Sequence, residues 1–571
     1  MKSRTSFFSA TVLKKNILRF APVWGLYTLI MLLYLFISVG NSTPAMLAKD
    51  VKYLLGPMAS VNFAYAGICA ILLFGDLYNS RMCNALHAFP LRRDGWLLTN
   101  VVSGILFSVV PNILMTVLGG ILLQEYAYMA AIWLAVMVLM FLFFFGTAVL
   151  SAVCAGNRLA MAAIYAIIHF IALLVFAVFE LIYQPILYGV IVDSDAFIRF
   201  CPLPQLSSFD FVEFQYSYGD LKGQFMGFEP EAWPYLGLCT VAGLVGFVLA
   251  WRVYLGRKME TAGDFISLRP LAPVFLVIFT VGVGTVFYLM SALFGDETLI
   301  LFLIGLPVGF FVGQMLLNRK VNVFGKKSLT GFGILLLALV GSILLTWLDP
   351  IGITRRVPKL ENIAWGSVYS ERDDYLYSRP EDASLKISDP AELESMRKFH
   401  SSLIKNPGWE DTCEVRILYA LKDGSHMYRS YEVAVDSELG EEAKQWFSDP
   451  RYVFQTNDAT RFYQNVESVV VAGMGGKFKD SEWTEELDEI KLVGDDVADF
   501  LNAVMADCEA GLMAQSYEFH PDEEELFDVH FDCNDAFGSG RRRYYINIYN
   551  GATNTVQYIK NAVSQQEGEN K

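Results

Sequence analysis

The chain has 571 residues, of which 54% are hydrophobic, and its 59 acidic residues outnumber its 44 basic ones. This hydrophobic content is high for a water-soluble protein, and the acidic balance is unusual for a protein that binds nucleic acid. Residues 1–350 hold 21 basic and 17 acidic residues, whereas the remainder holds 23 and 42. We therefore expect a membrane domain that is joined near residues 348–358 to a separate, acidic, soluble domain.

The N-terminal residues 1–21 precede the first long apolar run and have two different helical faces. One face is apolar and the other is basic: Leu13, Ile17 and Phe20 against Lys15 and Arg19. This pattern predicts an amphipathic helix along the inner membrane surface. A plain cytoplasmic extension, whose charges only fix the topology, is the alternative. The first apolar run is too long for a cleaved signal, so we expect it to stay as an anchor.

Nine apolar runs are each long enough to cross about 30 Å of hydrocarbon as a helix. They cover residues 23–40, 58–74, 97–123, 128–154, 159–190, 233–251, 271–294, 299–317 and 328–348. If the N-terminus is cytoplasmic, the inner segments collect 17 Lys and Arg residues, and the outer loops before Pro350 collect four. This asymmetry predicts a multi-pass plasma-membrane protein with a cytoplasmic N-terminus and, after nine crossings, an extracellular C-terminal domain.

Segment 81–93, between the second and third runs, combines apolar and basic side chains with a helix-breaking proline. Its candidate docking residues are Arg81, Met82, Leu86, His87, Phe89, Pro90, Arg92 and Arg93. A short amphipathic helix that ends near Pro90 would fit an apolar groove on a cytoplasmic partner. An interfacial turn that rests on lipid headgroups explains the same residues equally well.

His169 and Glu180 are the notable ionisable residues inside an apolar run. Eleven residues are about three helical turns, so a helix would place both side chains on one face. Ionisable groups inside a membrane usually face a bundle interior or a water-filled path, so this pair is a candidate for a translocation path. Alternatively, His169 bonds to a neighbouring helix and Glu180 lies near the outer headgroups.

No motif for an enzyme or a resident cofactor is found in the sequence. H-E-x-x-H and G-x-S-x-G are absent, and residues 473–478 and 325–328 fail the P-loop pattern. No cysteines have zinc-site spacing, so we expect neither a metal nor a cofactor in this chain. Four cysteines fall outside the apolar runs and could form one or two disulfide bonds: Cys201, Cys413, Cys508 and Cys533.

The region after about residue 351 has the pattern of a soluble α+β domain. A helix at 391–404 precedes strands at 413–420 and 428–435, which an Asp-Gly turn joins. A similar order recurs with a helix at 496–513 and strands at 524–532, 541–549 and 555–560. Residues 351–571 are therefore expected to form two α+β halves, which could be an internal repeat. The acidic surface would provide solubility or bind cationic peptides.

Several features together resemble the ABC-2 type transporter permeases, in particular a Gram-positive subgroup with a large C-terminal extracellular domain. They are the N-terminal amphipathic stretch, segment 81–93, the aromatic-rich loop 188–235, and the sequence Tyr-Leu-Gly-Arg-Lys-Met-Glu-Thr-Ala-Gly at 254–263. The resemblance implies an elbow helix at 1–21 and a six-span core at 22–269, followed by three further spans at 270–350. It also implies that segment 81–93 carries a coupling helix and that loop 188–235 forms short re-entrant helices. Ordinary anchoring of the aromatic side chains at the membrane interface is the alternative for this loop.

The resemblance implies the permease subunit of an ABC exporter, which moves an amphiphilic substrate such as an antimicrobial peptide or a lipid-like molecule. ATP and Mg²⁺ would be bound by separate cytoplasmic ATPase subunits, and a second permease, identical or related, would complete the path. The other expected partner is the lipid bilayer, and no nucleic acid is expected. A membrane-anchored sensor or binding protein with an extracellular ligand-capture domain is the alternative.

Overall fold

The chain forms two compact units, one of Met1–Tyr183 and Asp193–Leu344 and the other of Gln184–Val192 and Leu345–Lys571. The computed structural model describes residues 7–39, 43–83, 92–192, 197–217, 220–292, 299–370, 385–405, 412–447, 449, 451, 466–473, 490–510, 512, 525–534, 541–569. Four of the predicted docking residues lie outside these ranges: Leu86, His87, Phe89 and Pro90.

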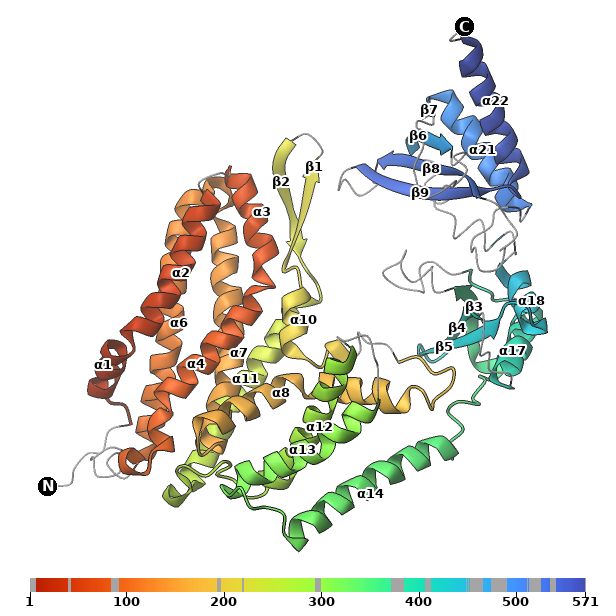
Figure 1. The fold of residues 1–571 in the computed structure, drawn as a ribbon. Coiled ribbons are helices and arrows are strands. Elements are labelled where there is room, and N and C mark those ends of the chain that lie inside the picture. The colour runs from red at the N-terminus through yellow and green to blue at the C-terminus, as the bar shows by residue number, and fades with distance from the viewer. Residues whose placement is uncertain are drawn as a thin grey trace, which may run out of the picture. The chain divides into compact units, whose positions relative to one another are not determined.

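Within the described residues, seven helices are long and apolar enough to cross a membrane (Figure 1). They are α6 (Arg93–Leu123), α7 (Tyr128–Cys154), α8 (Arg158–Val178), α11 (Ala232–Gly256), α12 (Leu271–Ala292), α13 (Leu299–Asn318) and α14 (Lys326–Leu348). Two bent pairs also pass: α1 (Ala10–Arg19) with α2 (Ala21–Val39), bent by 59°, and α3 (Pro44–Leu55) with α4 (Met58–Leu73), bent by 57°. Counting each pair as one span gives nine. The chain is therefore a polytopic helical membrane protein.

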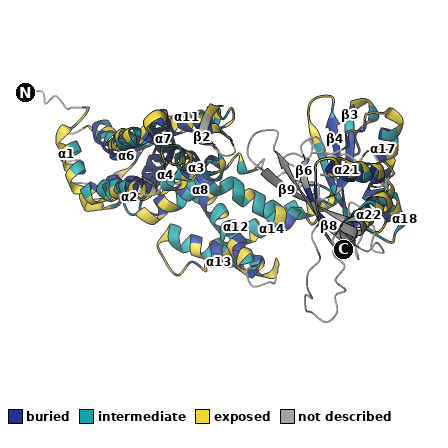
Figure 2. Ribbon diagram, turned by 90° about the horizontal axis from the view of Figure 1, so that it is seen from above, coloured by how far each residue is buried: buried dark blue, intermediate teal, exposed yellow. Residues whose placement is uncertain are grey.

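Helix α7 is the central helix of the first unit. It packs against α4, α6, α8 and α11, and Figure 2 shows it as largely buried. Its crossing with α11 depends on glycines, because a Cβ atom on Gly146 would lie 2.1 Å from the carbonyl oxygen of Gly243. Small residues at such crossings let helix backbones approach closely where the surrounding lipid supplies no hydrophobic driving force.

Helix α1 has the predicted faces, but it is attached to α6 by polar contacts. Asn16 is buried, and its Nδ2 donates to Oδ1 of Asn100 at 2.7 Å and to Oγ of Ser103 at 3.0 Å. Phe20 packs edge-on against Phe107, with 6.4 Å between ring centroids. The helix is therefore bound to protein through Asn16, which the apolar pattern alone did not indicate.

The fifth apolar run ends earlier than predicted. Helix α8 passes into a π-helix, η3 (Phe179–Tyr183), and the following Gln184–Val192 belong to the second unit. Pro185 explains the end, because proline lacks the backbone N–H and clashes with the preceding turn. The prediction that this span reaches residue 190 is wrong. The Oη of Tyr183 lies 2.8 Å from Oγ of Ser342, which fixes the end of η3 to α14.

Loop 188–235 contains a hairpin that was not predicted from the sequence. Its described part has the seven-residue helix α10 (Pro202–Ser208), two helical residues at 197–198, and an antiparallel hairpin of β1 (Val212–Ser217) and β2 (Asp220–Phe228). Short helices are therefore present in this loop, and their re-entrant position in a membrane stays a prediction. Shorter 3-10 turns elsewhere are η1 (Gly75–Tyr78), η2 (Gln124–Tyr126), η4 (Met259–Thr261) and η5 (Leu360–Asn362).

The second unit contains two halves with nearly the same order of elements. The first half has β3 (Ile363–Ser370), α17 (Pro390–Lys405), β4 (Thr412–Leu421), β5 (His426–Ala434) and α18 (Glu438–Phe447). The second has β6 (Val466–Gly473), β7 (Ile490–Val493), α21 (Asp495–Glu509), β8 (Glu525–Asn534), β9 (Arg541–Tyr549) and α22 (Thr553–Glu569). Their antiparallel sheets have the orders β3-β4-β5 and β7-β6-β8-β9, so β7 is the only added element within the described residues. The predicted β4–β5 hairpin is confirmed.

The predicted strand at 555–560 is wrong, because these residues belong to helix α22. The fully buried Asp507 accepts hydrogen bonds from the backbone N–H groups of Asn554 at 3.0 Å and Thr555 at 2.7 Å. Its carboxylate also accepts from their side chains, at 2.8 and 2.6 Å. A carboxylate satisfies the free N–H groups at a helix N-terminus, so this contact favours a helix where local β propensity favoured a strand.

Residues 184–192 pack on strand β5 of the second unit. Val190 forms an antiparallel bridge with Arg429, and the N–H of Ser430 donates to the carbonyl of Gly189 at 3.2 Å. Gly189 has a φ of +75°, and a Cβ atom there would lie 2.2 Å from the ring of Tyr431. This position therefore requires glycine, for its backbone conformation and for lack of space.

A buried histidine lies between α17 and the sheet of the first half. His400 is 0% exposed, with Nδ1 3.2 Å from Oη of Tyr419 and Nε2 2.8 Å from Oη of Tyr431. Burial, together with the nearby Arg429 guanidinium, lowers the pKa of His400 to about 3. The side chain is therefore neutral in the folded protein at neutral pH.

Candidate coupling site

The described ends of segment 81–93 lie at one corner of the first unit, where α4, α6 and α11 end or begin. Trp96 in the first turn of α6 packs against Phe74 and Tyr254, with ring centroids 5.6 and 5.7 Å apart. Phe74 follows α4, and Tyr254 is in the last turn of α11. These contacts fix the place from which the segment leaves α4 and the place at which it enters α6.

At the start of the segment, Arg81 and Met82 are exposed and Cys83 is buried. The backbone N–H of Arg81 donates to Oδ1 of Asn79 at 3.0 Å. Burial raises the pKa of the Cys83 thiol. Two side chains, Arg81 and Met82, are therefore available to a partner at this end.

At the other end, both arginines have intramolecular contacts. Arg92 forms an ion pair with Asp94 at 3.0 Å, and its guanidinium lies 3.8 Å from the ring centroid of Phe7. Arg93 donates to the backbone carbonyls of Leu255 and Arg257, each at 3.5 Å. The predicted docking residues thus differ, since Arg92 and Arg93 bind this chain while Arg81 and Met82 face outward.

Arg257 is buried at the centre of this corner, and sequence reasoning gave it no role. Its guanidinium donates to the carbonyls of Val153 at 2.8 Å, Ala152 at 3.4 Å and Leu77 at 3.3 Å. One side chain therefore joins the C-terminus of α7, the turn η1 and the residue that follows α11. Arginine suits this position because its planar guanidinium has five donors. The first arginine after the apolar run 233–251 is Arg252, so no sequence signal singles out Arg257 for this contact.

The chain after α11 is fixed to the α7–α8 connection by backbone hydrogen bonds. The N–H of Gly156 donates to the carbonyl of Phe265 at 3.2 Å, and the N–H of Gly263 donates to Gly156 at 2.8 Å. The N–H of Ser267 donates to Cys154 at 2.9 Å. The corner is thus held by hydrogen bonds across three connections, so a force applied at segment 81–93 would be passed to α6, α7 and α11.

The structure does not bring His169 and Glu180 together. His169 is 1% exposed, its Nε2 lies 3.0 Å from Oγ1 of Thr147 on α7, and aromatic rings such as Phe63 and Tyr165 surround it. Glu180 is exposed and lies in η3, where the α-helical periodicity is broken. His169 therefore bonds to a neighbouring helix, as the alternative interpretation expected, whereas Glu180 is exposed.

The described residues contain no cluster of three or more His, Cys, Asp or Glu side chains that could hold a metal ion. Cys201, Cys413 and Cys508 are buried and are not in a disulfide bond, and the side chain of Cys533 lies outside what the structure describes. Comparisons with protein families, with curated proteins and with solved structures find no match to this chain.

Proposed function

We propose that this chain is the permease subunit of an ABC-2 type exporter, driven by separate cytoplasmic ATPase subunits that bind ATP and Mg²⁺. The observation that carries the proposal is the anchored corner around Trp96 and Arg257, at which both described ends of segment 81–93 lie. A partner that pushes on this segment would act on α6, α7 and α11 together, which is the requirement for rigid-body switching of a membrane domain. The absence of a P-loop motif from the sequence agrees with a division of labour between two subunits.

The proposal includes a second permease, identical or related, that completes the translocation path, and an amphiphilic substrate. The soluble second unit supports a large domain outside the membrane, which we place on the extracellular side by the positive-inside rule.

The proposal is tested by purifying the tagged full chain gently from its host and identifying the bound proteins by mass spectrometry. We expect a nucleotide-binding ATPase to accompany the wild type and to be lost on Phe89→Asp, because a carboxylate would be buried in the partner's apolar groove. Phe324→Asp is the matched control, since Phe324 is 58% exposed and lies in a different basic loop.

Recovery of the ATPase with wild type and Phe324→Asp, but not with Phe89→Asp, would support the coupling role. Recovery of the chain without any ATPase, even after cross-linking, would refute the exporter and favour the membrane-anchored sensor. Recovery that is the same for all three chains would refute the role of Phe89.

A further inference from the structure

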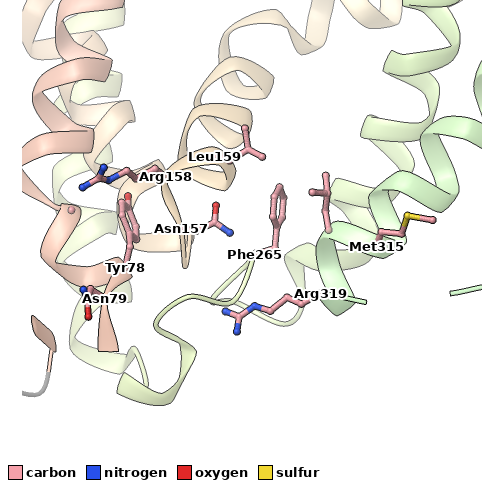
Figure 3. Close-up of a pocket in the computed structure, with 10 residues that line it drawn as sticks. Tyr78, Asn79, Asn157, Arg158, Leu159, Phe265, Met315 and Arg319 are labelled. Atoms are coloured by element: carbon pink, nitrogen blue, oxygen red, sulfur yellow. The ribbon is translucent and has the colours of Figure 1, made fainter. Parts of the chain in front are cut away.

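A cleft of about 640 Å³ opens beside the candidate coupling site (Figure 3). Its walls come from η1, the α7–α8 connection, the start of α8, the segment after α11 and the end of α13. Figure 3 shows Arg158 and Tyr78 on one side of the cleft and Met315 on the other. The cleft lies at the adjoining ends of two candidate membrane spans, α8 and α13.

Two arginines give the cleft its charge. Arg158 is exposed and, among the residues that the structure describes, forms no hydrogen bond or ion pair. Arg319 forms an ion pair with Asp264 at 3.2 Å, in which both side chains are 49% exposed. The amide of Asn157 adds a donor, since its Oδ1 is used as the N-cap acceptor for Ala160. An anion in the cleft would thus meet one unpaired and one singly paired guanidinium.

The backbone at Arg319 is unusual in a way that concerns this cleft. Arg319 has a φ of +53°, a left-handed conformation that a side chain with a Cβ atom rarely adopts. It directly follows α13, where this conformation ends the helix. The turn places the guanidinium at the cleft instead of continuing the helix. A residue with a strained backbone, Arg319, therefore lines the cleft.

The remaining lining is apolar. Phe265 is buried at 3% exposure, whereas Leu159, next to Arg158, is 62% exposed, and Met315 lies across the cleft. Exposed leucine beside exposed arginine at the end of a membrane span is the pattern expected at the boundary between acyl chains and headgroups. The cleft thus offers cationic donors and apolar contact within one cavity.

We propose that this cleft binds the phosphate headgroup of an anionic lipid, with Arg158 and Arg319 at the phosphate and an acyl chain along Leu159 and Met315. A lipid is favoured over a free phosphate ion because half-exposed arginines are screened by solvent and salt, so that charge alone binds weakly. The apolar wall supplies the second contribution, which only a ligand with a hydrocarbon chain can use. This inference does not depend on the proposed transport function.

Native mass spectrometry of the full chain in detergent tests the proposal, with dioleoyl phosphatidylglycerol, dioleoyl phosphatidylcholine and inorganic phosphate as probes. We expect the wild type to bind phosphatidylglycerol more tightly than phosphatidylcholine. Arg158→Gln should weaken phosphatidylglycerol binding about fivefold, because one basic residue near an anionic headgroup contributes about that much. Arg319→Gln should act in the same direction, and Arg252→Gln, an exposed arginine outside the cleft, is the control.

Equal melting temperatures of the four chains in phosphatidylcholine alone would show that the variants fold. The proposal is overturned if Arg158→Gln and Arg252→Gln bind phosphatidylglycerol equally well, or if the wild type does not distinguish the two lipids. Displacement of the lipid by millimolar inorganic phosphate would identify a site for the free ion and would also overturn it.

Discussion

Acidification should destabilise the first half of the second unit, because His400 is buried in its neutral form. In the unfolded chain this histidine has its usual pKa of about 6.5, whereas burial lowers the pKa to about 3 in the folded protein. Between these values the unfolded state binds a proton that the folded state does not, so the free energy of unfolding falls as the pH falls. The contribution is fully present above pH 6.5, and at pH 5.0 the loss is about 2 kcal/mol.

The groups that face His400 give no compensation for a positive charge. Tyr419 on β4 and Tyr431 on β5 place neutral hydroxyls against its two ring nitrogens, and Arg429 on β5 adds a nearby cation. Neutral imidazole can donate at one nitrogen and accept at the other, which fits two hydroxyls. A protonated ring would be a second buried cation beside Arg429.

Pulse proteolysis of the full chain in lipid nanodiscs, across a urea series at pH 7.5 and pH 5.0, measures the effect. The wild type should lose about 2 kcal/mol more between these pH values than His400→Gln, whose amide can hydrogen-bond both tyrosines without titrating. His426→Gln is the control, since His426 is exposed at the start of β5. The reasoning is refuted if His400→Gln retains the pH sensitivity of the wild type.

Three further predictions concern packing and capping. Asp507→Ala should destabilise α22 by about 3 kcal/mol, because the helix loses the carboxylate that accepts from its N-terminal N–H groups. The loss is measured as faster amide hydrogen exchange in α22, and Asp499→Ala, at an exposed position, is the control. Gly146→Ala should lower the melting temperature or prevent folding, since the added Cβ atom would lie 2.1 Å from the carbonyl oxygen of Gly243. A Cβ atom added at Gly237 would have no heavy atom within 4 Å, so Gly237→Ala should leave the melting temperature unchanged. Arg257→Met should raise the rate at which maleimide labels Cys154 roughly tenfold or more, because loss of the hydrogen bond to Val153 allows the chain to open locally. Arg252→Met is the control. Equal labelling rates in the two variants would show that the corner does not depend on Arg257.

Features with a local physical cause were predictable from the sequence. The apolar runs gave the candidate spans because hydrocarbon thickness sets helix length. The β4–β5 hairpin was predictable because Asp423 and Gly424 suit its turn, in which Gly424 has a φ of +84°. The end of the fifth span was indicated locally by Pro185, but the prediction used only the length of the apolar run.

Features that depend on distant residues were not predictable. Helix α22 forms where Asp507, far back in the sequence, caps its N-terminus. The role of Arg257 depends on carbonyl acceptors from α7 and η1, and the cleft at Arg158 needs α13 as its other wall. At the candidate coupling site, the role of segment 81–93 stays a prediction from Met82 and its basic neighbours, and the anchoring through Trp96 was not predictable.

The contribution of residues 184–192 to the second unit has a consequence for how the protein is made. Gly189 and Tyr431 are separated by about 240 residues of chain, so at 5–20 residues per second the ribosome adds the second partner roughly 12–50 s after the first. During that interval all helices from α11 to α14 are synthesised, while the short segment has nothing to pair with. Completion of the soluble fold thus reports that the last four membrane helices have been made, and a prematurely terminated chain would display an unpaired segment to the quality-control proteases of the cell.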